Sequence, residues 1–455
     1  MSKDNQKTAE VEDHDFSLVR VPKEHKQEFW RILLIRIGAI CCVSQLMLGA
    51  SLGMGMTFTD ALIATLLGSV LLQVLSWAIG AAAAKEGLST SLISRWAGFG
   101  VKGSAIFGAV VAISMIGWFG VQNSVFGQGM ADIIPVTDFL GSSEIAIWTV
   151  VTGLGITVLV VFGIRAIAHL ATIFVPLFIL AVIYAAYVML QTNDLGTLMN
   201  TAPPGAALTM GAAVTIVAGG FIAGAICTPD YARFLSNSKQ VFWMTLIGTF
   251  IGELGMNMTA VLLAHATGTE NVVDLMMATS GFIGVLIVVA STVKLNDINL
   301  YASGLGLMNA ANALSGKKLN RNILIVCLGA VGTTLSVIGI INYFTDFLIL
   351  LGVAIPPVAG IMVIDYYVLK RSRKDLDESR ALGKLPAKVE VWNPVAIVSW
   401  IVGFAVGQTT VIINLGIPGL NSLIVAGLLY FAIMKILAKI KNVEVVEFKK
   451  VDSTI

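Results

Sequence analysis

The chain contains twelve apolar stretches of about 20 residues, each long enough to cross the roughly 30 Å of bilayer hydrocarbon as a helix. Only 12% of its residues are charged, about half the share usual in soluble domains. We therefore expect an all-α polytopic membrane protein with twelve transmembrane helices. The stretches lie near residues 31–53, 59–82, 104–130, 143–163, 168–190, 207–227, 240–265, 281–311, 322–341, 344–369, 394–413 and 418–438.

Positive charge is confined to alternate connections. Of the 29 Lys and Arg residues, all but Arg36 and Lys294 lie in the two tails or in or beside every second connection. Basic connections face the cytoplasm in most membrane proteins. The pattern predicts a multi-pass protein of the cytoplasmic (inner) membrane with both termini in the cytoplasm. The intervening connections, near 54–58, 131–142, 191–206, 266–280 and 414–417, contain no Lys or Arg.

The spans and polar segments divide the chain into consecutive parts. The first tail has no basic start leading into a short apolar core, so we expect no signal peptide. We predict a cytoplasmic tail at 1–30, a five-helix repeat at 31–190, a second, inverted repeat at 207–369, a basic cytoplasmic loop at 370–393, two helices at 394–438 and a cytoplasmic tail at 439–455.

The eighth stretch, 281–311, carries polar residues in its middle: Lys294, Asn296, Asp297 and Asn299. A charged side chain at the bilayer centre costs several kcal/mol or more, so such groups face a bundle interior or a watery cavity. The pattern favours a substrate or ion site. The alternative is a buried ion pair that only locks helices together.

Two other ionisable residues fall inside stretches. Glu253 in the seventh is a candidate proton relay or partner for Lys294, or else a residue facing the cytoplasmic vestibule. For Arg36 in the first stretch, we expect a side chain that reaches back to the membrane interface.

Glycine and polar residues interrupt two stretches at corresponding places of the repeats. They are residues 43–53 in the first and 218–225 in the sixth. Interrupted helices in matching positions of two halves indicate the binding site of a secondary transporter. The alternative is close helix packing through small residues. We predict a broken helix at each.

Trp118 and Gln122 of the third stretch are four residues apart, so they lie on one helical face. Trp offers a flat stacking surface, and Gln offers both a donor and an acceptor. The pair suits a planar heteroaromatic ring with amide edges. The alternative for Trp118 is a packing or interfacial role.

Nothing in the sequence indicates an enzyme, a metal site or a cofactor. The four cysteines all lie in apolar stretches without metal-ligand spacing, and we expect no disulfide. No nucleophile motif or phosphate-binding loop is present.

Four segments carry a resemblance to the nucleobase:cation symporter family, most closely to its cytosine permease branch. They are Gly117-Trp118-Phe119-Gly120-Val121, Thr228-Pro229-Asp230-Tyr231-Ala232-Arg233-Phe234, Asn296-Asp297 followed by Leu300-Tyr301-Ala302-Ser303-Gly304-Leu305-Gly306, and Ala354-Ile355-Pro356-Pro357-Val358-Ala359-Gly360. The resemblance runs collinearly from about residue 45 to 370. It implies the LeuT-type fold of two inverted five-helix repeats plus two helices.

The resemblance also implies a binding site. The substrate ring would lie between Trp118 and Phe221, and its edges would be read by amides, hydroxyls and backbone groups. The implied substrate-binding residues are Trp118, Gln122, Phe221, Gly219, Gly220, Asn296, Gln45 and Ser44.

The chain departs from the family pattern at several of these positions. Met115 stands where cytosine permease has a glutamine, and Ala223 where it has a serine, so the identity of the base stays open. Lys294 and Leu295 occupy the positions of two hydroxyl ligands that hold sodium in sodium-driven relatives. We hypothesise that the Lys294 ammonium stands in for sodium, with Lys294, Asp297 and Glu253 as the proton-coupling groups.

The sequence therefore predicts a secondary active transporter that imports a nucleobase, a purine or cytosine-like heterocycle, by symport with a proton rather than sodium. Its partners would be the small nucleobase, H⁺ (or Na⁺) and the lipid bilayer, and not nucleic acid. The sequence does not indicate an oligomeric state. Alternatives are a transporter of allantoin, hydantoin or a vitamin-like heterocycle, an amine or amino-acid transporter of the same fold, and a channel or sensor.

Overall fold

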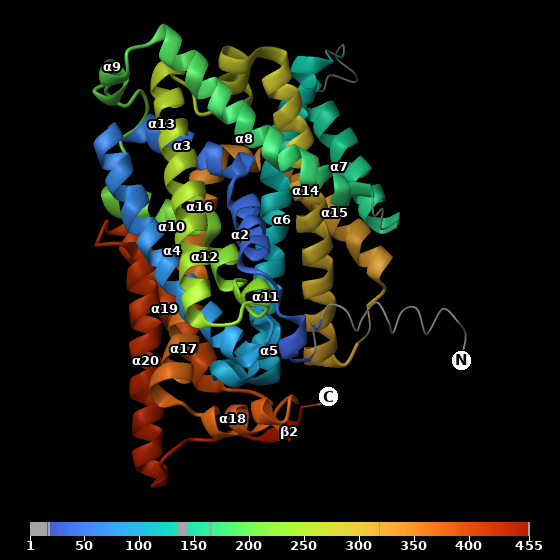
Figure 1. The fold of residues 1–455 in the computed structure, drawn as a ribbon, viewed down its shortest axis with the longest axis vertical. Helices are drawn as coiled ribbons and strands as arrows, with labels where there is room; N and C mark the ends of the chain where they lie inside the picture. The colour runs from blue at the N-terminus through green and yellow to red at the C-terminus, as the bar shows by residue number, and fades with distance from the viewer. Residues whose placement is uncertain are drawn as a thin grey trace.

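The computed structural model describes residue 16 and residues 19–134, 136, 143–162, 166–317 and 319–453, with backbone only for 166–175. Nearly all of these residues are helical (Figure 1). The helices of the first half are α2 (Phe29–Ile40), α3 (Val43–Gly55), α4 (Phe58–Glu86), α5 (Thr90–Ser94), α6 (Gly100–Ile133), α7 (Glu144–Phe162), α8 (Ala166–Thr192) and α9 (Leu195–Met199), with η1 (Lys23–His25) and η2 (Arg95–Phe99).

The second half continues in the same way and adds one small sheet. Strands β1 (Lys388–Glu390) and β2 (Lys450–Asp452) pair antiparallel. The helices are α10 (Met210–Ile226), α11 (Pro229–Ala232), α12 (Ser238–Thr249), η3 (Phe250–Gly255), α13 (Met256–Thr267), α14 (Val272–Ser315), α15 (Arg321–Val337), η4 (Ile340–Tyr343), α16 (Phe344–Ala354), α17 (Pro356–Val363), η5 (Ile364–Leu369), α18 (Arg373–Ala381), α19 (Pro394–Ile412) and α20 (Pro418–Lys441).

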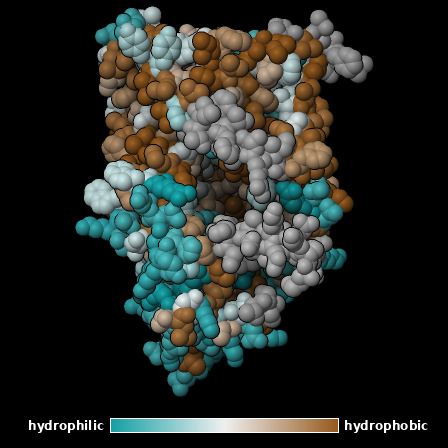
Figure 2. Space-filling view, turned by 45° about the vertical axis from the view of Figure 1, so that its right-hand side comes forward, coloured by the Kyte–Doolittle hydropathy of each residue, from teal (hydrophilic) through white to brown (hydrophobic). Residues whose placement is uncertain are grey.

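These helices account for every predicted stretch in the described residues. Singly or joined end to end, they form nine segments of the described chain that are long and apolar enough to cross a membrane, and the bent pair α2–α3 adds a tenth. The remaining two stretches correspond to shorter apolar helices, Pro176–Thr192 within α8 and Arg321–Val337. Figure 2 shows hydrophobic residues over the upper part of one face and hydrophilic residues below, with a hollow where the two meet.

Helix ends follow the local chemistry of the sequence. The Thr57, Thr209 and Asn237 side chains each accept a hydrogen bond from a backbone N–H of the first turn that follows. Such caps satisfy donors that the helix itself leaves unpaired. At the other end, Gly87 and Gly268 adopt the left-handed conformation (φ +67° and +74°) that closes α4 and α13.

The first span is broken, but not where the sequence predicted. The axis bends by 51° between α2 and α3, at Cys41 and Cys42, which leave the helical region. The predicted break at 43–53 is therefore wrong, because these residues form the regular helix α3. Cys41 and Cys42 instead provide the non-helical backbone at mid-span.

The predicted break at 218–225 is also wrong. Helix α10 runs without interruption from Met210 to Ile226. Its glycines serve packing instead: a Cβ on Gly219 would lie 1.9 Å from the Leu348 carbonyl oxygen of α16. Small residues allow helix backbones to approach this closely, so the alternative interpretation holds for this segment.

Two groups of helices separate in the packing. Helices α2, α3, α4, α10, α12 and α13 pack on one another, and we call them the bundle. Helices α6, α7, α14 and α15 form a second group, the scaffold, in which α14 runs along α6 (Figure 1). The long helix α14 begins before the predicted residue 281 and is kinked there, at Gly281 with φ +61°.

The end of the molecule that carries α5, α18 and β2 holds much of the basic sequence, and we call it the basic end (Figure 1). Segment 19–27 is attached to it. Arg20 forms an ion pair with Glu86 at 3.1 Å, and Lys26 donates to three backbone carbonyls, of Ala84, Arg233 and Leu235. These contacts join the first described residues to the ends of α4 and α11.

Candidate functional site

Trp118 lies on α6 and points toward α16. Its ring makes edge-on contacts with Phe344 and Phe347, with centroid separations of 6.1 and 5.3 Å. Only 7% of the residue is exposed. Aromatic rings prefer such edge-to-face contacts, which hold the indole at a fixed angle between scaffold and α16.

Gln122, one turn further along α6, joins three helices. Its Nε2 donates to Ser44 Oγ of α3 at 2.8 Å, and its Oε1 accepts from Asn299 Nδ2 of α14 at 3.3 Å. The structure thus brings Gln122 and Ser44, two of the predicted substrate contacts, within hydrogen-bond distance of each other. Asn299 was in the polar cluster of the eighth stretch but not among the predicted substrate contacts, and its spacing of three residues from Asn296 is the signal that could have found it.

Asn296 is fully buried in α14, and neither its Oδ1 nor its Nδ2 has a hydrogen-bond partner in the described part of the chain. Buried amides are nearly always paired. An amide with both ends free beside the Gln122–Asn299 pair is therefore a group available to a ligand.

Three predicted substrate contacts, Gly219, Gly220 and Phe221, lie on helix α10 of the sixth span. Because α10 is regular, the backbone groups of Gly219 and Gly220 belong to the helix, and their place near a substrate ring stays a prediction. A Cβ on Gly220 would meet Leu48 of α3 at 2.3 Å. The Phe221 ring lies close over Gly224 and under the guanidinium of Arg36, 4.4 Å from its Cζ.

Gln45 serves a different partner from its neighbour Ser44. Its Nε2 donates to Glu253 Oε2 at 2.5 Å and to Asn257 Oδ1 at 2.8 Å. Successive helical residues point about 100° apart, so Ser44 faces the scaffold while Gln45 faces η3 and α13. Contact of both residues with one substrate ring stays a prediction.

Arg36 does not reach the membrane interface as predicted. It is fully buried, with 0% exposure, and its side chain contacts residues of α4, α10, α11 and α12. Its guanidinium donates to Tyr231 Oη at 2.5 Å and to Ser76 Oγ at 3.3 Å. The expectation failed because hydrophobicity along one helix cannot reveal polar partners on two others.

Lys294 and Asp297 are half-buried on α14. Lys294 lies within electrostatic range of Cys42, at the break of the first span. Within the described side chains, which exclude 166–175 of the adjacent α8, it forms no ion pair with Asp297 or Glu253. The break thus has a cation on its scaffold side and the Glu253 carboxylate on its bundle side.

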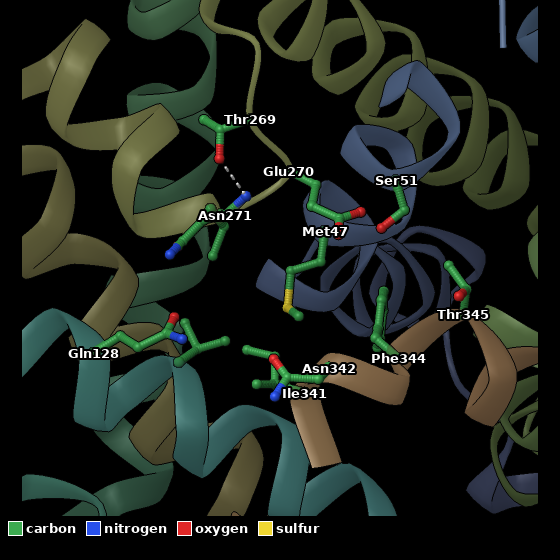
Figure 3. Close-up of a pocket in the computed structure, with 12 residues that line it drawn as sticks. Met47, Ser51, Gln128, Thr269, Glu270, Asn271, Ile341, Asn342, Phe344 and Thr345 are labelled. Carbon is green, nitrogen blue, oxygen red and sulfur yellow. Dashed lines mark hydrogen bonds between the residues drawn. The ribbon is translucent and has the colours of Figure 1, made fainter. Parts of the chain in front are cut away.

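A cavity of about 190 Å³ adjoins this region, on the side away from the basic end. Its lining includes Met47 and Ser51 of α3, Gln128 of α6 and Phe344, which also touches Trp118. Figure 3 shows Gln128 of α6 on one side of the cavity and Glu270, in the loop between α13 and α14, on the other. The cavity has no signature in the sequence because its walls come from four distant segments.

Known proteins resemble this chain over most of its length. The family described as permeases for cytosine/purines, uracil, thiamine and allantoin matches residues 20–431. Cytosine permease of Escherichia coli (strain K12) is 30% identical over 400 residues, covering 87% of this chain and 90% of that protein. Hydantoin permease of Microbacterium maritypicum is 23% identical over 402 residues, covering 84% and 80%.

Solved structures share the fold. The inward-facing conformation of Mhp1 superimposes with a TM-score of 0.76 at 19% identity, covering 93% of this chain and 94% of that one. Mhp1, described as a nucleobase-cation-symport-1 family transporter, in a closed conformation with bromovinylhydantoin bound gives 0.71, with 93% and 96% covered. The predicted LeuT-type fold is confirmed. The chain is a multi-pass membrane transporter, not an enzyme, and belongs to the family of permeases for cytosine, purines, uracil, thiamine and allantoin.

Proposed function

We propose that the protein imports a nucleobase, a purine or cytosine-like heterocycle, across the cytoplasmic membrane by symport with a proton rather than sodium, with both termini in the cytoplasm. The observation that carries the proposal is the amide set of Gln122, Asn296 and Asn299 beside the Trp118 indole. A flat ring stacks on indole, and its polar edge pairs with amides.

The substrate contacts we retain are Trp118, Gln122, Ser44, Asn296 and Phe221. The unpartnered amide of Asn296 would gain its hydrogen bonds from the ligand. A site built around such buried groups rejects molecules that leave them unpaired, so the positions of donors and acceptors on the ring decide which heterocycle is carried. Met115 and Ala223 offer no hydrogen bond to the ring, whereas cytosine permease has a glutamine and a serine at these positions. This argues against recognition of cytosine by the contacts that cytosine permease uses.

The coupling cation follows from the residues at the break. Lys294 brings an ammonium group close to Cys42, where sodium-driven relatives would hold their ion. Lys294, Asp297 and Glu253 are the groups we assign to coupling. A lysine there removes the need for sodium and leaves a proton as the transported cation.

Hydantoins and allantoin form the second candidate substrate class. One relative of this chain is named hydantoin permease, and Mhp1 is described with bromovinylhydantoin bound. These molecules also present a planar ring with amide edges, which the same amide set would read. Amines and amino acids fit less well, because the retained contacts include no carboxylate or ammonium group for their charges.

The test is uptake of labelled bases by proteoliposomes, with competition by adenine, guanine, hypoxanthine, cytosine, uracil, allantoin and hydantoin. We expect one nucleobase to compete best, and uptake in choline buffer to equal uptake in sodium buffer under an inward proton gradient. A strict sodium requirement would refute the proton assignment. Preference for an amino acid would refute the substrate assignment.

A further inference from the structure

Arg36 is the largest of the fully enclosed side chains in the described protein. Its guanidinium donates to two hydroxyls and lies over the Phe221 ring, but its Nε has no hydrogen-bond partner in the described residues. Burial of a charge is costly unless it is paired. The bundle therefore holds a cation in its core, and no carboxylate of the described residues is in direct contact with it.

The seventh span presents an incomplete polar cluster to the same interior. Thr249, Glu253 and Asn257 are all buried, and each has one polar atom without a partner: Oγ1, Oε1 and Nδ2. Gln45 Nε2 bridges the Glu253 carboxylate and the Asn257 amide. Glu253 lies in the π-helical stretch η3, a distortion often found at functional sites.

Few charged or titratable groups face Glu253. From the elements packed against it, Arg36 of α2 and the thiols of Cys41 and Cys42 lie within electrostatic range. Among the described residues, Lys294 and Asp297 of the scaffold form no ion pair or hydrogen bond with it; its hydrogen bonds come from Gln45 and the Asn257 side chain. Arg36 is thus the charge that balances an ionised Glu253, although the two form no ion pair within 4.0 Å.

We propose that Glu253 is the proton-binding site, carried inside the moving bundle, and that Arg36 transmits its protonation state to Phe221 at the substrate. This inference rests on the proposed function, because it names the group that loads the coupling proton. Glu253 Oε1, the unpartnered oxygen, takes the proton from the outer solution and later returns it to the cytoplasm.

The composition of the cluster favours a proton over a metal ion. A monovalent metal needs several oxygens and repels a nearby guanidinium. Here the unpartnered atoms include the Arg36 and Asn257 donors as well as the Glu253 and Thr249 oxygens, and donors do not ligate metals. A proton needs one carboxylate oxygen and leaves the donors in place.

Protonation changes what Arg36 interacts with. With Glu253 ionised, its carboxylate is the negative charge that balances the Arg36 guanidinium, near the break of the first span at Cys41 and Cys42. With Glu253 protonated, the remaining interactions of the guanidinium are with the Phe221 ring and the hydroxyls of Tyr231 and Ser76, so it holds Phe221 more firmly. A held ring receives the ligand at lower entropic cost. Proton and ligand binding therefore reinforce each other, and the effect is reciprocal.

The decisive experiment compares Glu253→Gln with the unaltered protein in liposomes and in detergent. The amide keeps the shape of the side chain and imitates the protonated state. We expect accumulation driven by a pH gradient to fall to its gradient-free level, while exchange of labelled for unlabelled base continues. We also expect ligand affinity to lose its pH dependence, which should span about 5- to 150-fold in the unaltered protein, the usual range of coupling.

Glu447→Gln, at an exposed carboxylate outside the transport site, is the matched control and should keep pH-dependent binding. A second measurement needs no variant: a pH-indicator dye should report uptake of one proton per bound base. Gradient-driven accumulation by Glu253→Gln at the original level would overturn the inference, as would pH-dependent affinity lost in Lys294→Gln but kept in Glu253→Gln.

Arg36 is tested by a double-variant cycle. Arg36→Gln alone should weaken ligand binding and remove its pH dependence. Arg36→Gln combined with Glu253→Gln should bind no worse than Arg36→Gln, because both act through one route. Additive losses would overturn the transmission through Arg36. Failure of every tested base to bind the unaltered protein would instead refute the proposed substrate class.

Discussion

Two buried clusters of polar side chains in this transporter differ in how completely their hydrogen bonds are satisfied. The basic-end cluster consists of Arg20, Glu86, Tyr366 and Arg380. Both Glu86 carboxylate oxygens are occupied, Oε2 by Arg20 at 3.1 Å and Oε1 by Arg380 at 2.6 Å and Tyr366 at 2.8 Å. The bundle network of Arg36, Gln45, Glu253 and Asn257 leaves atoms of three of its members unpaired.

The difference separates two uses of buried polarity. A charge whose hydrogen bonds are complete contributes to holding elements together, and it has nothing left to offer a ligand. An incomplete network costs stability and persists where a transported species completes it. We therefore expect variants of the basic-end cluster to affect stability first, and variants of the bundle network and substrate site to affect binding first.

The largest expected effect is on the basic-end cluster. Glu86→Gln removes the partner of buried Arg20 and should destabilise the protein by about 3 kcal/mol. The thermal unfolding midpoint in detergent measures this loss. Transport per folded molecule should persist, and a transport-dead variant with an unchanged midpoint would break the comparison.

A packing variant comes next. Gly219→Ala would force a Cβ to within 1.9 Å of the Leu348 carbonyl oxygen, and overpacking of this kind typically costs about 1–3 kcal/mol. Gly108→Ala is the control, since a Cβ there meets no atom within 4 Å. The unfolding midpoint should fall for Gly219→Ala only; equal midpoints would contradict the close approach of α10 and α16.

Trp118→Ala tests the substrate side of the comparison. Loss of stacking should weaken base binding by about 1–3 kcal/mol, or roughly 5- to 150-fold. Equilibrium binding of labelled base measures it. The thermal unfolding midpoint should fall less than it does for Glu86→Gln. Trp243→Ala, at an exposed indole, should bind normally, and equal losses in both variants would argue against stacking.

The smallest effect concerns the polar edge. Gln122→Leu removes the amide that donates to Ser44 and accepts from Asn299. The hydrogen bond that this amide would make to the ligand is lost with it, which should weaken binding by about 1 kcal/mol. The ranking of competing bases should change as well as the affinity. An unchanged ranking would mean that Gln122 only connects helices.

The sequence alone determined the features that depend on amino-acid composition and on the helical repeat. Apolar length predicted the spans because bilayer thickness sets it. The four-residue spacing placed Trp118 and Gln122 on one helical face because the helix repeat does so. The same spacing rule could have joined Asn299 to Asn296.

Only the tertiary structure decided which partner each face meets. Ser44 and Gln45 are neighbours, yet one faces Gln122 and the other Glu253. The sequence of the first span suggested an interfacial Arg36, but residues of four other helices enclose its side chain. Gly219 and Gly220 suggested a break in the sixth span, but they allow α16 and Leu48 to pack closely against α10. Local sequence sets the direction of a side chain relative to its own helix, whereas the neighbour that it meets depends on the arrangement of all the others.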